Sequence, residues 1–145
     1  MDAKAKDDLF YVCSLIEYIA RKTGNTRADI SKFFSEQEIQ RQLRLAEINH
    51  CLSFEQVADE LIDMLQIPDG PEHPQFLYAV PSVQAIGRVY QMLVSSVCTD
   101  GNTAAALKRV LESFISDEIS NFNSHVYYSS PDYLRCSYLA GELLA

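Results

Sequence analysis

The sequence predicts an all-α protein, a compact bundle of about seven helices in which four short helices precede three longer ones. Apolar residues recur at spacings of three and four along most of the chain, as on the buried face of a helix. Ser or Thr repeatedly precedes such a run, with an acidic residue or Gln three positions later. No stretch alternates cleanly between apolar and polar residues over five positions, so no strand is predicted.

The first predicted helix covers residues 4–23. Its buried stripe comprises Leu9, Val12, Cys13, Ile16, Ile19 and Ala20. Gly24-Asn25 is expected to end this helix, because both residues tolerate the left-handed conformation found at helix C-termini.

Three shorter helices are predicted next, at 27–34, 36–50 and 54–65. Each begins after a residue that can cap a helix N-terminus, and these residues are Thr26, Ser35 and Ser53. Because the links are short, the four helices of residues 1–65 are expected to form a compact cluster.

Residues 66–81 interrupt the helical pattern with three prolines and a glycine between positions 66 and 74. Proline lacks an amide donor and restrains the residue before it, so no helix is expected to cross this stretch. Phe76, Leu77 and Tyr78 are expected to fix the connection to the core. The segment separates an N-terminal half, 1–65, from a C-terminal half, 82–145, which together are expected to form one compact domain.

Three longer helices are predicted in the C-terminal half. The fifth helix begins near Pro81-Ser82 and runs to Cys98, and the sixth covers residues 103–122 as one apolar seam. The last helix begins at Pro131, because proline is favoured at the first helical position and Ser130 can cap the end.

The net charge of −8 lies entirely in the second part of the chain. Residues 1–50 contain eight basic and eight acidic side chains, whereas residues 51–145 contain four basic and twelve acidic ones. Nucleic acid is therefore an unfavourable partner for residues 51–145, because phosphate binding depends on Lys and Arg. An acidic surface fits either a solvated face or a basic protein partner.

The four cysteines are far apart in the sequence and lie in apolar stretches, which predicts buried, reduced thiols in a cytoplasmic protein. No apolar run reaches the length of a membrane span, and the first residues lack the apolar core of a signal peptide. We therefore expect a cytoplasmic protein with no membrane association.

No motif predicts catalysis, a metal or a cofactor. His50-Cys51 are adjacent, but neighbouring residues on a helix point in different directions, so zinc binding is not expected. Asp59 and Asp63 share a helical face without the usual His partner, which favours a solvated acidic surface. The glycines are scattered and form no phosphate-binding loop. An enzyme with an unrecognised site stays open as an alternative.

Residues 27–48 have the outline of a helix-turn-helix. The second of the two helices contains side chains that read bases in other proteins, namely Gln37, Gln40, Arg41 and Arg44. Residues 21–45 contain six basic and three acidic side chains, the only stretch with a net positive charge. Glu36 and Glu38 would face the phosphates of DNA, however, so a DNA-binding regulator is the second hypothesis.

The most distinctive local sequence contains three tyrosines just before and within the last predicted helix, at Tyr127, Tyr128 and Tyr133. Tyrosine is a large amphipathic side chain that is enriched at protein interfaces. The cluster predicts either packing of the last helix onto the bundle or a surface for a protein partner.

Three segments of the first half carry a resemblance to a known family, namely Phe10 to Ala20, the helix from Asp29-Ile30 to Phe34, and Glu47-Ile48-Asn49-His50. Through these segments the first half resembles a small helical bacterial family of unknown function. The second half resembles a companion protein of the same gut-bacterial gene clusters through Ile86-Gly87-Arg88-Val89-Tyr90 and Tyr127-Tyr128-Ser129-Ser130-Pro131. Such clusters often include an ADP-ribosyltransferase-like protein, so the resemblance implies a partner-binding or toxin-neutralising role.

The leading hypothesis is therefore a non-enzymatic, protein-interaction or accessory protein of a bacterial cytoplasm, with an antitoxin-like role as one form of it. The acidic second half and the tyrosine cluster motivate this hypothesis. Its partner is expected to be another protein or a second copy of the chain.

Overall fold

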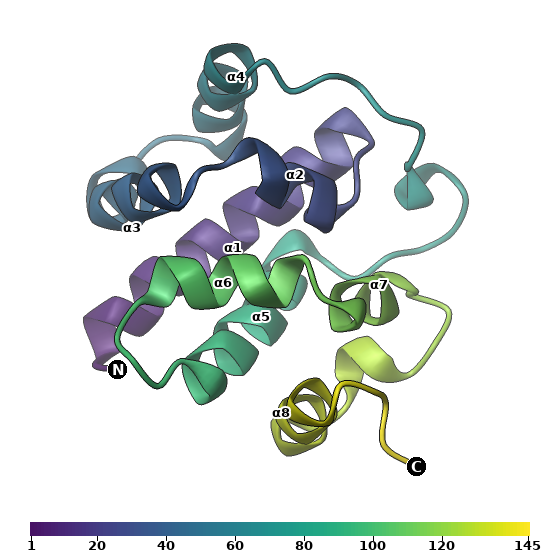
Figure 1. The fold of residues 1–145 in the computed structure, drawn as a ribbon. Helices are drawn as coiled ribbons and strands as arrows, with labels where there is room; N and C mark the ends of the chain where they lie inside the picture. Colours follow the sequence, from purple (N-terminus) through teal and green to yellow (C-terminus); the bar gives the residue numbers. More distant parts are fainter.

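The central element of the structure is its first and longest helix, α1, which spans Ala3–Thr23. In the computed structural model, which describes all residues from 1 to 145, this helix passes through the middle of the bundle (Figure 1). Asp2 caps its start by accepting the Ala5 amide, and Gly24 ends it in the left-handed conformation with φ 77°. Apolar residues surround most of its middle, so nearly every side chain from Leu9 to Ala20 is buried.

Three helices follow on one side of α1: α2 at Arg27–Phe33, α3 at Glu36–Asn49 and α4 at Phe54–Leu65. Each begins with a hydroxyl that accepts the amide three residues on, from Thr26, Ser35 and Ser53 respectively. These are the caps and, within one residue, the helices that the sequence predicts.

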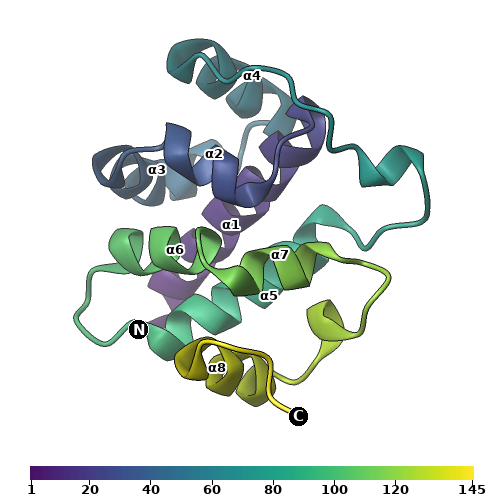
Figure 2. The ribbon, with the colours of Figure 1, turned by 45° about the vertical axis from the view of Figure 1, so that its right-hand side comes forward.

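The C-terminal half contains α5 at Val83–Val97, α6 at Thr103–Leu111, α7 at Phe114–Ser120 and α8 at Pro131–Ala140. Short 3-10 helices, η1 at Pro74–Phe76 and η2 at Val126–Tyr128, lie in the connections. Figure 2 shows α5 running beside α1, and α8 beside α5 at the opposite side from α4. The all-α prediction is confirmed, with eight α-helices and no strand.

The prediction of one helix over residues 103–122 is wrong, because the chain breaks at Glu112 and Ser113. Ser113 has an extended backbone, with φ −92° and ψ 170°. Its hydroxyl donates to the Val110 carbonyl at 2.7 Å, a local bond that competes with the helical one. The apolar seam continues across the break, because Leu111 and Ile115 are both buried. Periodicity alone therefore did not reveal the second helix start.

A single hydrophobic cluster joins both halves of the chain. It includes Leu9, Ile16 and Ile30 from the first half and Ile86, Leu107 and Ile115 from the second. The α1–α5 contact is close at Gly87, where an added Cβ would meet the Cα of Ser14 at 3.0 Å. The absence of a side chain at Gly87 allows the two helices to approach.

Candidate functional site

A strap formed by residues 68–80 connects α4 to α5 and lies against the C-terminal end of α1. The Gly70 and Glu72 amides donate to the Thr23 and Gly24 carbonyls, each at 2.7 Å. The Asn25 amide group donates to the Pro68 carbonyl at 2.7 Å.

Gly24 and Gly70 make this close approach feasible. A Cβ on Gly24 would collide with the Gly70 carbonyl oxygen and the His73 ring, and a Cβ on Gly70 would collide with the Gly24 carbonyl oxygen. The proline-rich connection is therefore fixed to α1 mainly through its backbone.

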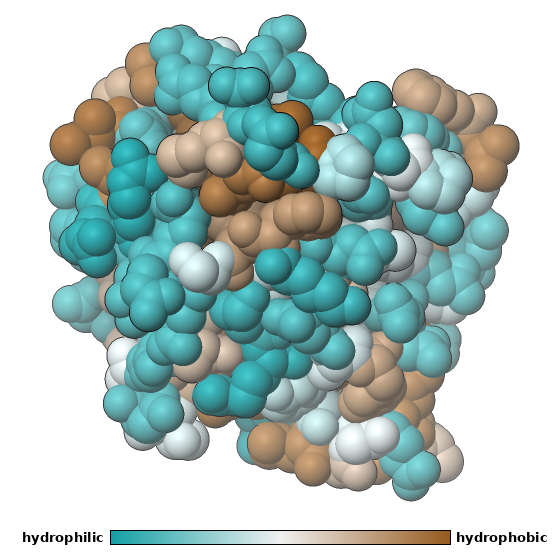
Figure 3. Space-filling model, turned by 45° about the horizontal axis from the view of Figure 1, so that its top comes forward, coloured by the Kyte–Doolittle hydropathy of each residue, from teal (hydrophilic) through white to brown (hydrophobic).

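The tip of the strap exposes its apolar side chains, contrary to the sequence prediction. Phe76 is 77% exposed and Leu77 is 80% exposed, while Tyr78 is also exposed at 36%. The backbone bonds hold the strap without them, and the η1 turn directs Phe76 onto the ring of His73, with ring centroids 5.1 Å apart. Figure 3 shows a hydrophobic group at its upper right, on the side of the molecule where the strap lies in Figure 1.

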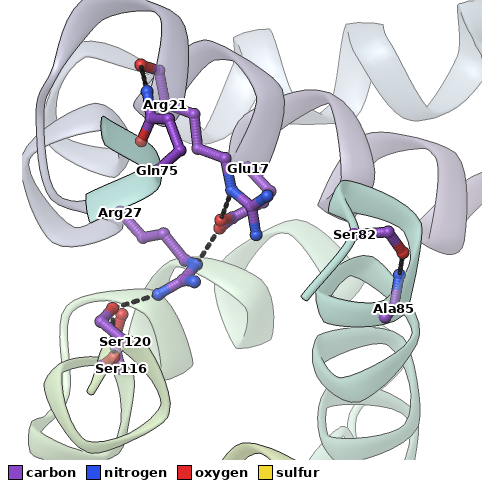
Figure 4. A network of polar contacts seen from close by, with 8 residues as sticks. All are labelled: Glu17, Arg21, Arg27, Gln75, Ser82, Ala85, Ser116 and Ser120. Carbon is purple, nitrogen blue, oxygen red and sulfur yellow. Dashed lines mark hydrogen bonds and ion pairs between the residues drawn. The ribbon is translucent and has the colours of Figure 1, made fainter. Parts of the chain in front are cut away.

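Behind the strap lies a buried polar cluster of three charged side chains, Glu17, Arg21 and Arg27. Arg21 Nε donates to one carboxylate oxygen of Glu17 at 2.7 Å, and Arg27 Nε donates to the other. Arg27 also donates through Nη1 to the Ser120 hydroxyl of α7 (Figure 4). The cluster thus joins α1, α2 and α7 through bonds to ionised groups, which are the stronger kind.

Arg27 is almost completely buried, at 4% exposure. Its guanidinium carbon lies 5.1 Å from the ring centroid of Tyr90 and 5.7 Å from that of Phe122. Burial disfavours the charged guanidinium, but the Glu17 carboxylate and Tyr90 together outweigh it, so the pKa of Arg27 is raised. Arg27 therefore stays charged inside the protein.

A cavity of about 110 Å³ opens beside this cluster. The charged or polar side chains in its wall include Glu17, Arg21, Thr26, Arg27, Glu72 and Ser120. The strap contributes Glu72, Pro74 and Tyr78, and α1 and α7 form the opposite sides. The cavity is thus assembled from both halves of the chain.

The four side chains proposed to face DNA, Gln37, Gln40, Arg41 and Arg44, are all exposed on α3. Most of the basic side chains of residues 21–45 form ion pairs with carboxylates of the protein, however. Arg21 and Arg27 bind Glu17, Lys22 contacts Asp59 at 2.9 Å, and Arg41 contacts Glu38 at 3.2 Å. The helices α2 and α3 pack mainly on α1 and α6.

The three tyrosines of the predicted partner surface lie on η2 and α8 and differ in exposure. Tyr127 packs edge-on against Phe122, with centroids 5.7 Å apart. The Tyr133 hydroxyl donates to the Leu144 carbonyl at 2.9 Å. Only Tyr128 is largely free, at 68% exposure.

The cysteines do not behave alike, so the prediction that all four are buried is wrong. Cys13 is buried, Cys51 is exposed, and Cys98 and Cys136 are intermediate. Burial raises the pKa of the Cys13 thiol far above its ordinary value, which keeps it protonated and unreactive. No group of three His, Cys, Asp or Glu side chains is placed to hold a metal ion. No helix is long and apolar enough to cross a bilayer.

No protein-family model, curated protein or solved structure matches this chain. The strap and the polar cluster are therefore interpreted from their own geometry. The sequence predicts the proline-rich connection, but neither the exposed tip of the strap nor the polar cluster. Glu17 and Arg21 stand four residues apart on a helix, a spacing that favours an ion pair, but nothing local indicates that Arg27 joins them.

Proposed function

We propose that the chain is a non-enzymatic protein-interaction protein whose strap tip, Phe76 and Leu77, inserts into an apolar pocket of a protein partner. The observation that carries this proposal is the exposure of both side chains on a strap that backbone hydrogen bonds fix to α1. A preorganised apolar anchor loses little conformational entropy when it binds.

The charges around the strap specify the kind of partner. Asp69 and Glu72 on the strap are exposed, and so are the acidic residues of the neighbouring α4, which are Glu55, Asp59, Glu60 and Asp63. Few basic side chains balance them on this side, since Lys22 alone pairs with Glu55 and Asp59. The partner is therefore a protein whose apolar pocket has a basic rim, which complementary charge favours.

Other exposed apolar side chains make weaker candidates. Ile48 and Leu139 are exposed on helices, which is ordinary for a globular surface. Tyr128 is exposed on η2, a short helix separate from the strap. Met64 lies in a groove between α3 and α4 with Leu45, Val57 and Leu61.

The resemblance to helical proteins of bacterial gene clusters fits this proposal and supplies a first set of candidate partners, the neighbouring gene products. In its antitoxin-like form, the protein would occupy a neighbouring toxin through the strap tip. Co-expression of the chain would then restore growth to cells that express this toxin.

The experiment compares binding of the wild type, the strap-tip variant Phe76→Ser/Leu77→Ser and the control variant Leu139→Ser to each co-expressed neighbouring product. A basic protein that binds the wild type and the control, but loses at least about tenfold affinity for the strap-tip variant, supports the proposal. Binding that survives the strap-tip variant unchanged overturns it. A dimer that forms in the absence of partners and dissociates with the variant would identify a second copy as the occupant instead.

DNA binding through α3 is a second candidate, because Gln37, Gln40, Arg41 and Arg44 follow one exposed helical face. DNA binding ranks below the protein-interaction proposal, because acidic side chains neutralise most of the neighbouring basic charges. A mobility-shift assay at low salt on the promoter of the gene tests it. No shift at micromolar protein, or an equal shift by Arg41→Gln/Arg44→Gln, removes this candidate.

A further inference from the structure

The cavity behind the strap contains more hydrogen-bond donors than the protein uses. Arg21 donates only through Nε, so neither of its terminal nitrogens has a protein acceptor, and Nη2 is buried in that state. Arg27 donates through Nε to Glu17 and through Nη1 to Ser120, and its guanidinium lies against the Tyr90 ring, so Arg27 adds positive charge to the cavity wall. Buried donors without acceptors are rare in folded proteins because each one costs free energy.

The charges of the buried cluster do not balance either. Two guanidinium groups share the single carboxylate of Glu17, which leaves one positive charge in the wall of the cavity. The only other carboxylate in the wall is Glu72, which is exposed on the strap and makes no ion pair. The inner part of the cavity is therefore positive, and Glu72 lies at its solvent-exposed wall.

Further donors lie in the same wall. The Thr26 hydroxyl accepts the Asp29 amide and keeps its own proton available. The Tyr78 hydroxyl makes no hydrogen bond within the protein. The volume of about 110 Å³ exceeds the room that one water requires. It suits a small tetrahedral group rather than a nucleoside.

We propose that this cavity binds a small oxyanion of the phosphate or sulfate class between Arg21 and Arg27. Guanidinium groups are planar forks that bind such oxygens in pairs, and the fork of Arg21 has two terminal nitrogens without a protein acceptor. The anion would offset the positive charge that the two guanidinium groups leave in the wall of the cavity. Its oxygens would accept from the terminal nitrogens of Arg21, which have no acceptor within the protein.

The strap makes this site more than a patch of surface charge. Glu72, Pro74 and Tyr78 close one side of the cavity, and Gln75 on the same strap donates to the Arg21 carbonyl at 3.0 Å. An oxyanion held there would contact α1, α2 and the strap at once, so it would stabilise the folded protein in proportion to its occupancy.

Isothermal titration calorimetry with inorganic phosphate, sulfate, acetate and chloride at constant ionic strength tests the proposal. The expected result is saturable binding of phosphate and sulfate, with acetate weaker and chloride without effect. Arg21→Gln is expected to weaken phosphate binding at least about tenfold, since it removes a charged donor. Glu72→Gln is expected to tighten it about fivefold, because it removes a repulsive charge.

The control variant is Arg44→Gln, an exposed arginine outside the cavity, which is expected to bind phosphate as the wild type does. Phosphate and sulfate also stabilise proteins in general by exclusion from their surfaces, so a thermal shift alone does not count. The absence of saturable heat up to about 10 mM phosphate, roughly ten times the Kd of a weak millimolar complex, overturns the proposal. Equal binding by wild type, Arg21→Gln and Glu72→Gln also overturns it. If Arg21→Gln does not fold, the comparison of Glu72→Gln with wild type decides.

Discussion

The two sides of α1 bury very different surfaces. Towards α5, the helix presents apolar side chains and a tight contact at Ser14 and Gly87. Towards the strap, its C-terminal end presents Glu17, Arg21 and backbone carbonyls, beside a cavity rather than a filled core. The first contact holds the fold together by exclusion of water, whereas the second relies on directional polar bonds. The polar contact is therefore the part of the molecule that a ligand or partner can change.

Of the two sides of α1, the polar side is expected to show the larger effect, from Arg27→Ala. This substitution leaves the buried Glu17 with Arg21 alone and removes the bond to Ser120, so we expect the free energy of unfolding to fall by about 3 kcal/mol. Urea denaturation at neutral pH measures it. Arg44→Ala, at an exposed position, is the matched control and should change stability by no more than about 0.5 kcal/mol. Equal losses in the two variants would mean that the buried cluster is dispensable.

On the apolar side, Gly87→Ala tests how tightly α1 and α5 pack. Alanine favours a helix over glycine, but the new methyl group would press on the Ser14 backbone. We expect a net loss of about 2 kcal/mol in urea denaturation, as for other overpacked cores. Gln84→Ala, on the exposed side of the same helix, should be close to neutral. A Gly87→Ala variant as stable as the wild type would show that the two helices can separate without cost.

The same division explains what could be predicted from the sequence. The caps at Thr26, Ser35, Ser53 and Ser130 are local signals, and each begins a helix as predicted. The break at Ser113 was missed because the apolar period continues across it. The polar cluster was missed for a different reason. Its third contact joins residues 27 and 120, and no short-range pattern encodes a hydrogen bond between such distant positions.

A pH dependence distinguishes the buried interior from the surface. The Cys13 thiol has an ordinary pKa of 9.0, and burial raises it in the folded protein. Above that pH the unfolded chain loses this proton and the folded protein keeps it, so stability present below pH 9.0 declines as the pH rises. The slope that Cys13 contributes is about 1.4 kcal/mol per pH unit.

Stability measured from pH 8 to above pH 10 should therefore fall less steeply in Cys13→Ala than in the wild type. Burial also raises the pKa of Tyr90, and Tyr90 contributes the same slope to the wild type and to Cys13→Ala. Cys51→Ala is the control, because Cys51 is exposed. The stability of this variant should fall with pH as steeply as that of the wild type. Parallel curves for all three proteins would show that the thiol of Cys13 ionises freely in the fold.

The smallest expected effect comes from the strap tip, and its smallness is informative. The sequence predicts that Phe76 and Leu77 fix the connection to the core, yet each is at least 77% exposed. Phe76→Ser/Leu77→Ser should therefore change the free energy of unfolding by no more than about 0.5 kcal/mol. Phe34→Ser, which removes a ring that is 1% exposed, should cost at least about 3 kcal/mol. A large loss from the strap-tip variant would mean that these side chains pack on the protein in solution. If stability is unaffected, selection for stability does not account for two large apolar residues at this position, which is the result that the proposed binding to a partner predicts.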